Sequence, residues 1–138
     1  MENKEQKTCA SNTLPIKRRQ VEEGVTILHE TGCTELNITI NKGEENKIIE
    51  TFIRPAKEGG CRASLEAVGR LISLALRYGI PLQEVIKQLR GIRCKACTAK
   101  SFDNELPDLH YSCPDSISRA LGKADRFFKG EKKNVEDI

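Results

Sequence analysis

The chain is short of aromatic side chains, of long apolar runs and of any export signal. It contains no Trp, two Tyr and four Phe among 138 residues, so a hydrophobic core has to be built mainly from Ile, Leu, Val and Ala. No stretch approaches the roughly 18 consecutive apolar residues of a membrane-spanning helix, and the N-terminus is too polar to begin a signal peptide. We therefore expect a cytoplasmic protein without a membrane segment, of a size that suits one domain.

An excess of one charge is also nearly absent. The formal net charge is +3, and residues 1–19, with five Lys or Arg and two Glu, account for all of it. The rest of the chain is therefore neutral overall. This balance argues against a folded domain built as a nucleic-acid clamp, which would carry its basic excess on one folded face.

Both ends of the chain lack the hydrophobic periodicity of helices and strands. Residues 1–20 and 130–138 are rich in polar and charged residues, which is typical of solvated tails. The folded domain is therefore expected to span residues 21–129. The N-terminal tail is basic, so a basic arm stays open as a feature of this protein.

Three segments near the start of the folded part have the composition of strands. Residues 25–30 and 36–41 are rich in β-branched side chains, and the second alternates strictly between apolar and polar. A third strand is expected over residues 47–54. We expect an antiparallel meander, with Gly32 and Gly43 supplying positive φ in its turns.

The apolar period then changes to that of helices. Apolar residues recur at helical spacing over 65–76 and stop at Gly79, and a second helix over 81–90 is closed by Gly91. A last helix begins at Ser112, after a polar loop. The predicted fold class is α+β: a three-stranded antiparallel meander, two helices, a cysteine-containing loop and a C-terminal helix.

In contrast to its few aromatic residues, the chain contains six cysteines. In a reducing compartment, metal ligation or redox chemistry explains them better than disulfides do. Cys94-Lys95-Ala96-Cys97 has the spacing of a zinc knuckle, in which two thiolates from one turn occupy two corners of a tetrahedron. Cys113 lies at a predicted helix N-terminus, where the helix dipole favours the thiolate.

Topology brings further cysteines to the same place. In a meander the turn between the first two strands lies at the end of the sheet where the third strand exits, so Cys33 and Cys61 share that end. The first helix runs away from it and the second returns, which delivers Cys94. We therefore predict a structural Zn²⁺ site that ties the fold, held by Cys33, Cys61, Cys94 and Cys113, with Cys97 as a neighbouring fifth thiol that could substitute.

Alternatives stay open for these residues. Free Cys is often buried as a small hydrophobe, and His110 could replace one thiolate in a Cys₃His site. A thioredoxin-like role for Cys94 and Cys97 is disfavoured, because that motif follows a strand and opens a helix. Cys9, in the N-terminal tail, is interpreted as an exposed thiol without a role.

The residues around the cysteines resemble a known family. Tyr111-Ser112-Cys113-Pro114-Asp115 looks like the signature of the TSCPD domain, with Tyr in place of the leading Thr. Four further segments resemble the C-terminal domain of adenosylcobalamin-dependent (class II) ribonucleotide reductases, namely residues 31–33, 59–61, 68–80 and 88–94. The resemblance covers about residues 15–121, nearly the whole predicted domain.

The resemblance implies an accessory role. The family's four cysteine positions fall on Cys33, Cys61, Cys94 and Cys113, and Cys97 is an addition to the family pattern. The radical-bearing barrel is absent from this short chain, and no cysteine after Cys113 provides the C-terminal dithiol. We therefore expect a free-standing domain that does not reduce ribonucleotides alone. The implied partner is a reductase catalytic subunit, which would carry adenosylcobalamin, and a homo-oligomer stays open.

A nucleotide- or nucleic-acid-binding module with a regulatory role is the alternative function. Gly59 and Gly60 lead into a helix and are flanked by Arg54, Lys57 and Arg62, and such a backbone can cradle a phosphate. Neither a P-loop nor a Gly-x-Gly-x-x-Gly run accompanies them. A tight turn beside solvated basic residues is therefore the simpler interpretation.

Overall fold

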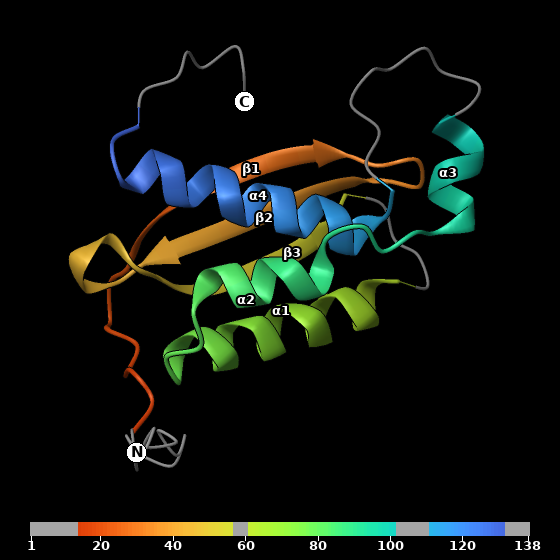
Figure 1. The fold of residues 1–138 in the computed structure, drawn as a ribbon. Coiled ribbons are helices and arrows are strands. Elements are labelled where there is room, and N and C mark those ends of the chain that lie inside the picture. Colours follow the sequence, from red (N-terminus) through yellow and green to blue (C-terminus); the bar gives the residue numbers. More distant parts are fainter. Residues whose placement is uncertain (1–13, 57–60, 102–110, 132–138) are drawn as a thin grey trace, which may run out of the picture.

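The structure is a computed structural model that describes residues 14–56, 61–101 and 111–131. Its sheet has three antiparallel strands in the order β1-β2-β3, with bounds β1 Glu23–Glu30, β2 Glu35–Lys42 and β3 Ile48–Pro55 (Figure 1). The helices are α1 Arg62–Arg77, α2 Leu82–Leu89, α3 Lys95–Ser101 and α4 Cys113–Phe128. The predicted α+β meander followed by helices is confirmed.

Alternation in β2 decides which face of the sheet is buried. Leu36, Ile38 and Ile40 have no exposed surface. Ile38 lies opposite Ile27 in β1 and Ile53 in β3, so a row of isoleucines crosses the sheet. The apolar side of α4 and part of α2 pack on this face, as their position in front of the sheet indicates (Figure 1).

Helix α1 lies along the open edge of β3. The Ser73 hydroxyl oxygen accepts a hydrogen bond from the Thr51 backbone N–H at 3.0 Å and contacts the Gly69 carbonyl oxygen at 2.8 Å. A Cβ on Gly69 would lie 3.3 Å from the Thr51 carbonyl oxygen, so the helix and the strand approach closely here. The helix thereby satisfies edge groups that an unpaired strand would leave exposed.

Two details of the sequence prediction are wrong. The polar loop between α2 and α4 contains the short helix α3, because Thr98 and its neighbours continue the turn that begins at Cys94. The Thr98 backbone N–H donates to the Cys94 carbonyl oxygen at 2.9 Å.

Positive φ in the β2–β3 turn falls on Glu45 and Asn46 (55° and 58°), whereas Gly43 has a φ of −99° and Gly32 is not among the positive-φ residues. The 3-10 turn over Glu44–Asn46 reverses the chain in place of a glycine.

The last part of the predicted N-terminal tail contacts the folded body. The Ile16 backbone N–H donates to the Arg77 carbonyl oxygen at 3.0 Å, and Arg18 Nε lies 3.0 Å from Glu50 Oε1. Residues 1–13 and 132–138 lie outside the described residues. The domain limits at residues 21 and 129 stay a prediction. Among the helices that the structure describes, none has the length and apolarity needed to cross a membrane.

Candidate metal centre

Five cysteines lie within the described residues, all at one end of the molecule. The turn between β1 and β2 carries Cys33, and Cys61 immediately precedes α1. Cys94 and Cys97 stand at the start of α3, and Cys113 is the first residue of α4. This turn and these helix starts all lie on the right of Figure 1. Cys9 and His110 lie outside the described residues.

Three of these thiols converge on one point. The Sγ atoms of Cys33, Cys94 and Cys97 all lie within 4.8 Å of one another, and the Sγ atoms of Cys33 and Cys97 are 3.4 Å apart. Tetrahedral zinc with Zn–S bonds of about 2.3 Å separates its sulfur ligands by about 3.8 Å. The observed spacing therefore suits three of four thiolate ligands around one metal ion.

A fourth thiol lies beside the three. Cys113 Sγ is 4.0 Å from Thr31 Oγ1 in the turn that carries Cys33. Burial raises the pKa of Cys113 to about 11, and the charges of Cys97, Cys61 and Cys94 contribute in the same direction. Cys113 and the exposed Cys61 are thus within electrostatic reach of the group, although neither belongs to the three converging sulfurs. Either could complete a four-thiolate site.

The protonation of the three central thiols is uneven. Loss of water around the sulfur, followed by the hydrogen bond with Cys97, raises the pKa of Cys33 to about 12. The backbone N–H of Cys97, helped by that of Ala96, lowers the pKa of Cys94. Cys94 is therefore the thiol most ready to ligate a metal ion, whereas Cys33 would have to give up a proton first.

Local backbone contacts place Cys33 against Cys97. Thr31 Oγ1 accepts hydrogen bonds from the backbone N–H groups of Cys33 and Thr34, at 3.3 and 3.1 Å, and so shapes the turn. Gly32 packs on the backbone of Cys97, where an added Cβ would lie 2.6 Å from the Cys97 Cα. Only glycine allows this approach, which explains why the turn and α3 can share one site. Cys97 is 1% exposed, the most deeply buried cysteine among those described.

The start of α4 organises the other side of the site. Ser112 Oγ accepts a hydrogen bond from the Asp115 backbone N–H at 3.2 Å and caps the helix. The Asp115 carboxylate, 1% exposed, accepts from the backbone N–H of Gly91 at 2.9 Å and of Tyr111 at 3.3 Å. It also accepts from Arg119 Nε at 3.1 Å.

These bonds hold the chain before α3 against the start of α4. The Cys94 backbone N–H donates to the Tyr111 carbonyl oxygen at 2.9 Å, so Cys94 and Cys113 are connected through Tyr111 and Asp115. Asp115 is not among the site residues predicted from the sequence. The Ser-x-x-Asp spacing at a helix start is a capping signal that could have found it.

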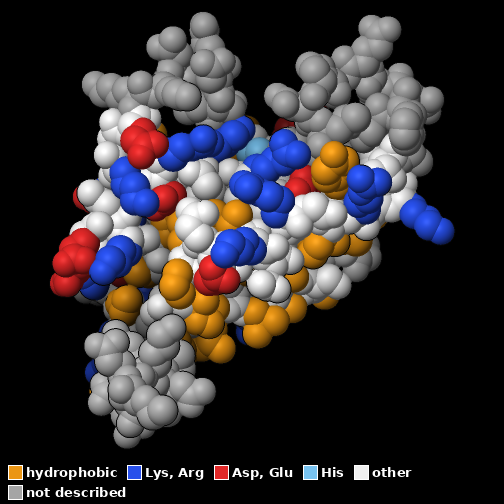
Figure 2. Space-filling view, in the orientation of Figure 1, with side chains coloured by type: hydrophobic (Ala, Val, Ile, Leu, Met, Phe, Trp, Pro, Cys, Tyr) orange, Lys and Arg blue, Asp and Glu red, His pale blue; other side chains and the backbone are white. Residues whose placement is uncertain are grey.

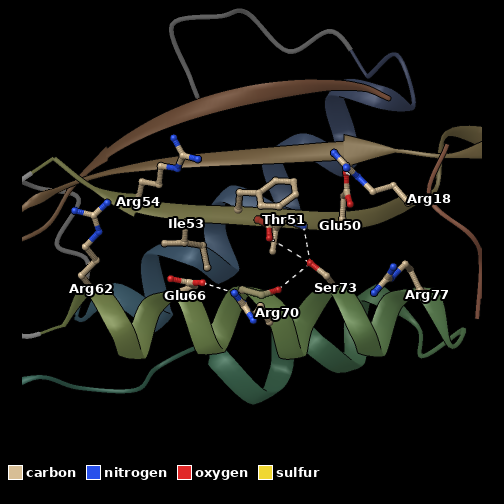
Figure 3. A pocket seen from close by; sticks show the side chains of 12 residues that line it. Arg18, Glu50, Thr51, Ile53, Arg54, Arg62, Glu66, Arg70, Ser73 and Arg77 are labelled. Atoms are coloured by element: carbon tan, nitrogen blue, oxygen red, sulfur yellow. Dashed lines mark hydrogen bonds and ion pairs between the residues drawn. The ribbon is translucent and has the colours of Figure 1, made fainter. Parts of the chain in front are cut away.

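The residues predicted to bind phosphate are only partly described. Lys57, Gly59 and Gly60 lie outside the described residues. Arg54 in β3 and Arg62 in α1 both line a groove with a volume of about 580 Å³ between these elements (Figure 3). The other basic residues of this groove were not predicted from the sequence, because their convergence depends on how α1 lies along β3.

Comparison with known proteins identifies one family. The TSCPD domain model matches residues 7–125. No match is found among curated proteins or among solved structures. The matched region includes the three converging thiols, Cys61 and the Ser112–Asp115 connection to the site. Because the match covers most of the chain, this protein belongs to the TSCPD domain family.

Proposed function

We propose that this protein is an accessory zinc-binding domain of an adenosylcobalamin-dependent ribonucleotide reductase and is not catalytic alone. The observation that carries the proposal is the cluster of Cys33, Cys94 and Cys97 within a TSCPD match that covers most of the chain. The segments around these cysteines resemble the C-terminal domain of such reductases. Adenosylcobalamin and the radical chemistry belong to the catalytic subunit in this proposal.

The donor set supports zinc as the metal. Soft thiolates in a tetrahedral arrangement select zinc or iron–sulfur centres, and a closed set of four thiolates is typical of structural zinc. Cys33, Cys94 and Cys97 would hold the ion, with Cys113 or Cys61 as the fourth ligand. A zinc ion bound there would tie the β1–β2 turn to α3 and contribute to the free energy of folding.

An exposed apolar surface supports a role that depends on a partner. Leu71, Leu74 and Tyr78 of α1, with Ile80 after it, are 66%, 45%, 51% and 48% exposed. Figure 2 shows hydrophobic side chains gathered along the side of the molecule where α1 lies. Contiguous exposed apolar side chains are typical of protein interaction sites. We assign this surface to the catalytic subunit.

Affinity capture of the tagged full chain from its native cell tests this function. The expected result is recovery of the reductase catalytic subunit by the unaltered chain and its loss with Leu71→Asp. Leu28→Asp is the matched control, because Leu28 is 62% exposed on the outer face of the sheet, away from α1. Failure to recover a reductase subunit, with reductase activity unchanged when the gene is deleted, would overturn the proposal.

A further inference from the structure

The groove between β3 and α1 gathers arginines at its two ends. Five arginines and two glutamates are among its lining residues. Figure 3 shows Arg54 and Arg62 at one end and Arg18 and Arg77 at the other. The chain is close to neutral outside its first 19 residues, and four of the five arginines come from that neutral part. Their local excess in one groove indicates an anionic ligand.

The glutamates do not cancel this excess. Arg18 Nε lies 3.0 Å from Glu50 Oε1, and an Arg70 guanidinium nitrogen lies 2.6 Å from Glu66 Oε1. Neither Arg54 nor Arg77 makes an ion pair with a described residue, and the buried Nε of Arg77 has no hydrogen-bond partner there. A buried donor without an acceptor is costly, so the Arg77 side chain, which lines the groove, gains a partner if it turns toward a ligand that brings an oxygen acceptor.

The groove also contains an aromatic ring between its two basic ends. Phe52 is 43% exposed, and the Arg18 guanidinium lies 5.8 Å from the centre of its ring. Phe52 lies opposite Thr39 of β2, and the Thr39 hydroxyl is 2.9 Å from that of Thr26 in β1. These three side chains therefore share the outer face of the sheet. No helix among the described residues covers this outer face of the sheet. A planar group can therefore stack on Phe52 once Arg18 moves aside.

We propose that this groove binds single-stranded nucleic acid, with phosphates at its two arginine ends and a base stacked on Phe52. Basic grooves with stacking aromatic rings are the usual solution for binding single strands without sequence preference. Arg62 and Arg77 are separated by about 22 Å along α1 at the rise of an α-helix, a span that suits successive phosphates of a strand rather than one triphosphate. This site is independent of the metal centre and goes beyond the proposed function.

Fluorescence anisotropy of labelled oligo(dT) and oligo(U) strands with the full chain tests the proposal. Strands of about 12 nucleotides fall within the site size of single-strand-binding domains. We expect binding that weakens as salt rises. Arg54→Gln should reduce the slope of log K against log salt by about 0.7, the value for one phosphate contact on a single strand. Arg126→Gln, an exposed arginine of α4 outside the groove, should leave the slope unchanged.

The aromatic contact has a separate readout. Phe52→Leu should weaken binding about tenfold, as expected for the loss of one stacked base, without changing the salt slope. Both variants alter exposed side chains, so their folding is retained. Equal affinity of the unaltered chain and both groove variants would overturn the proposal. So would binding of a nucleoside triphosphate or a duplex as tight as that of the strand.

Discussion

At the scale of single residues, burial and neighbouring donors distinguish the thiols. Cys97 lies outside the four ligand positions that the sequence resemblance implies, yet it is 1% exposed and its sulfur lies 3.4 Å from that of Cys33. Cys61 is exposed. The arrangement therefore makes Cys97 a central member of the proposed site, although the resemblance alone implies it only as a neighbouring fifth thiol.

Cys97→Ser should lower zinc affinity more strongly than Cys9→Ser, because it removes one of the three converging sulfurs. The measurement is bound zinc after competition with a chromophoric chelator. Cys61→Ser and Cys113→Ser, tested in parallel, identify the fourth ligand by which of them also loses zinc. Unchanged affinity in Cys97→Ser would contradict the arrangement of three converging thiols.

Zinc affinity should rise with pH across the neutral range. The pKa of Cys33 is raised to about 12 and that of Cys113 to about 11, so both hold their protons at neutral pH in the metal-free protein. A metal ion must displace each proton that a ligand carries. Each displaced proton makes affinity rise about tenfold per pH unit. Competition titrations between about pH 6 and pH 8 measure the slope, and a flat profile would contradict ligation by protonated thiols.

Asp115→Asn should destabilise the protein by about 3 kcal/mol, as expected when one partner of a buried charged network is removed. The Asp115 carboxylate accepts from the backbone at Gly91 and Tyr111 and from Arg119, and an amide cannot accept all three bonds. Urea unfolding measures the loss. Asp125→Asn is the control, because its exposed pair with Lys129 contributes less than about 1 kcal/mol. Equal losses in the two variants would contradict the role of Asp115.

At the scale of elements, the close approach of α1 to β3 is the contact that shapes the arginine groove. Gly69→Val should cost about 2 kcal/mol through overpacking, because the Cβ at this position already lies 3.3 Å from the Thr51 carbonyl oxygen and 3.4 Å from Ile53 Cδ1. Ala67→Val, on the exposed side of the same helix, should cost only a few tenths of a kcal/mol through helix propensity. Thermal unfolding compares the pair, and similar midpoints would contradict the close contact.

The order of helices and strands is predictable from the sequence where a residue of known preference marks the end of an element. Gly79 and Gly91 adopt positive φ after α1 and α2, at 85° and 79°, and Ser112 caps α4. Each is a signal contained within a few residues. Helix α3 and the position of α1 along the β3 edge are not predictable in this way, because both depend on contacts between distant segments.

The same distinction applies to the candidate site. Strand order and helix direction alone predict that Cys33 and Cys94 meet at one end of the sheet, and the structure brings their sulfurs together. The contact of Gly32 with the Cys97 backbone cannot be predicted from the spacing of the cysteines. The arginine groove escapes prediction for the same reason, since Arg18, Arg54 and Arg77 come from three separate segments.

At the scale of the whole molecule, the hydrophobic core and the proposed metal site both contribute to the free energy of folding. The buried hydrophobic residues that the structure describes include no Phe and no Tyr. The core consists of Ile, Leu, Val and Ala side chains between the sheet and its helices. Small domains with modest cores often depend on a metal or another cross-link, and the thiol cluster stands where the β1–β2 turn meets α3.

Metal analysis of the full chain, purified without added metal, is the decisive test of the zinc site. We expect about one zinc per chain, as for a single four-ligand structural site. Cys33→Ser combined with Cys97→Ser should abolish this zinc, and a chelator should lower the unfolding temperature of the unaltered chain. Absence of metal, freely reacting thiols at all five described cysteines and an unfolding temperature unaffected by chelator would contradict the zinc site.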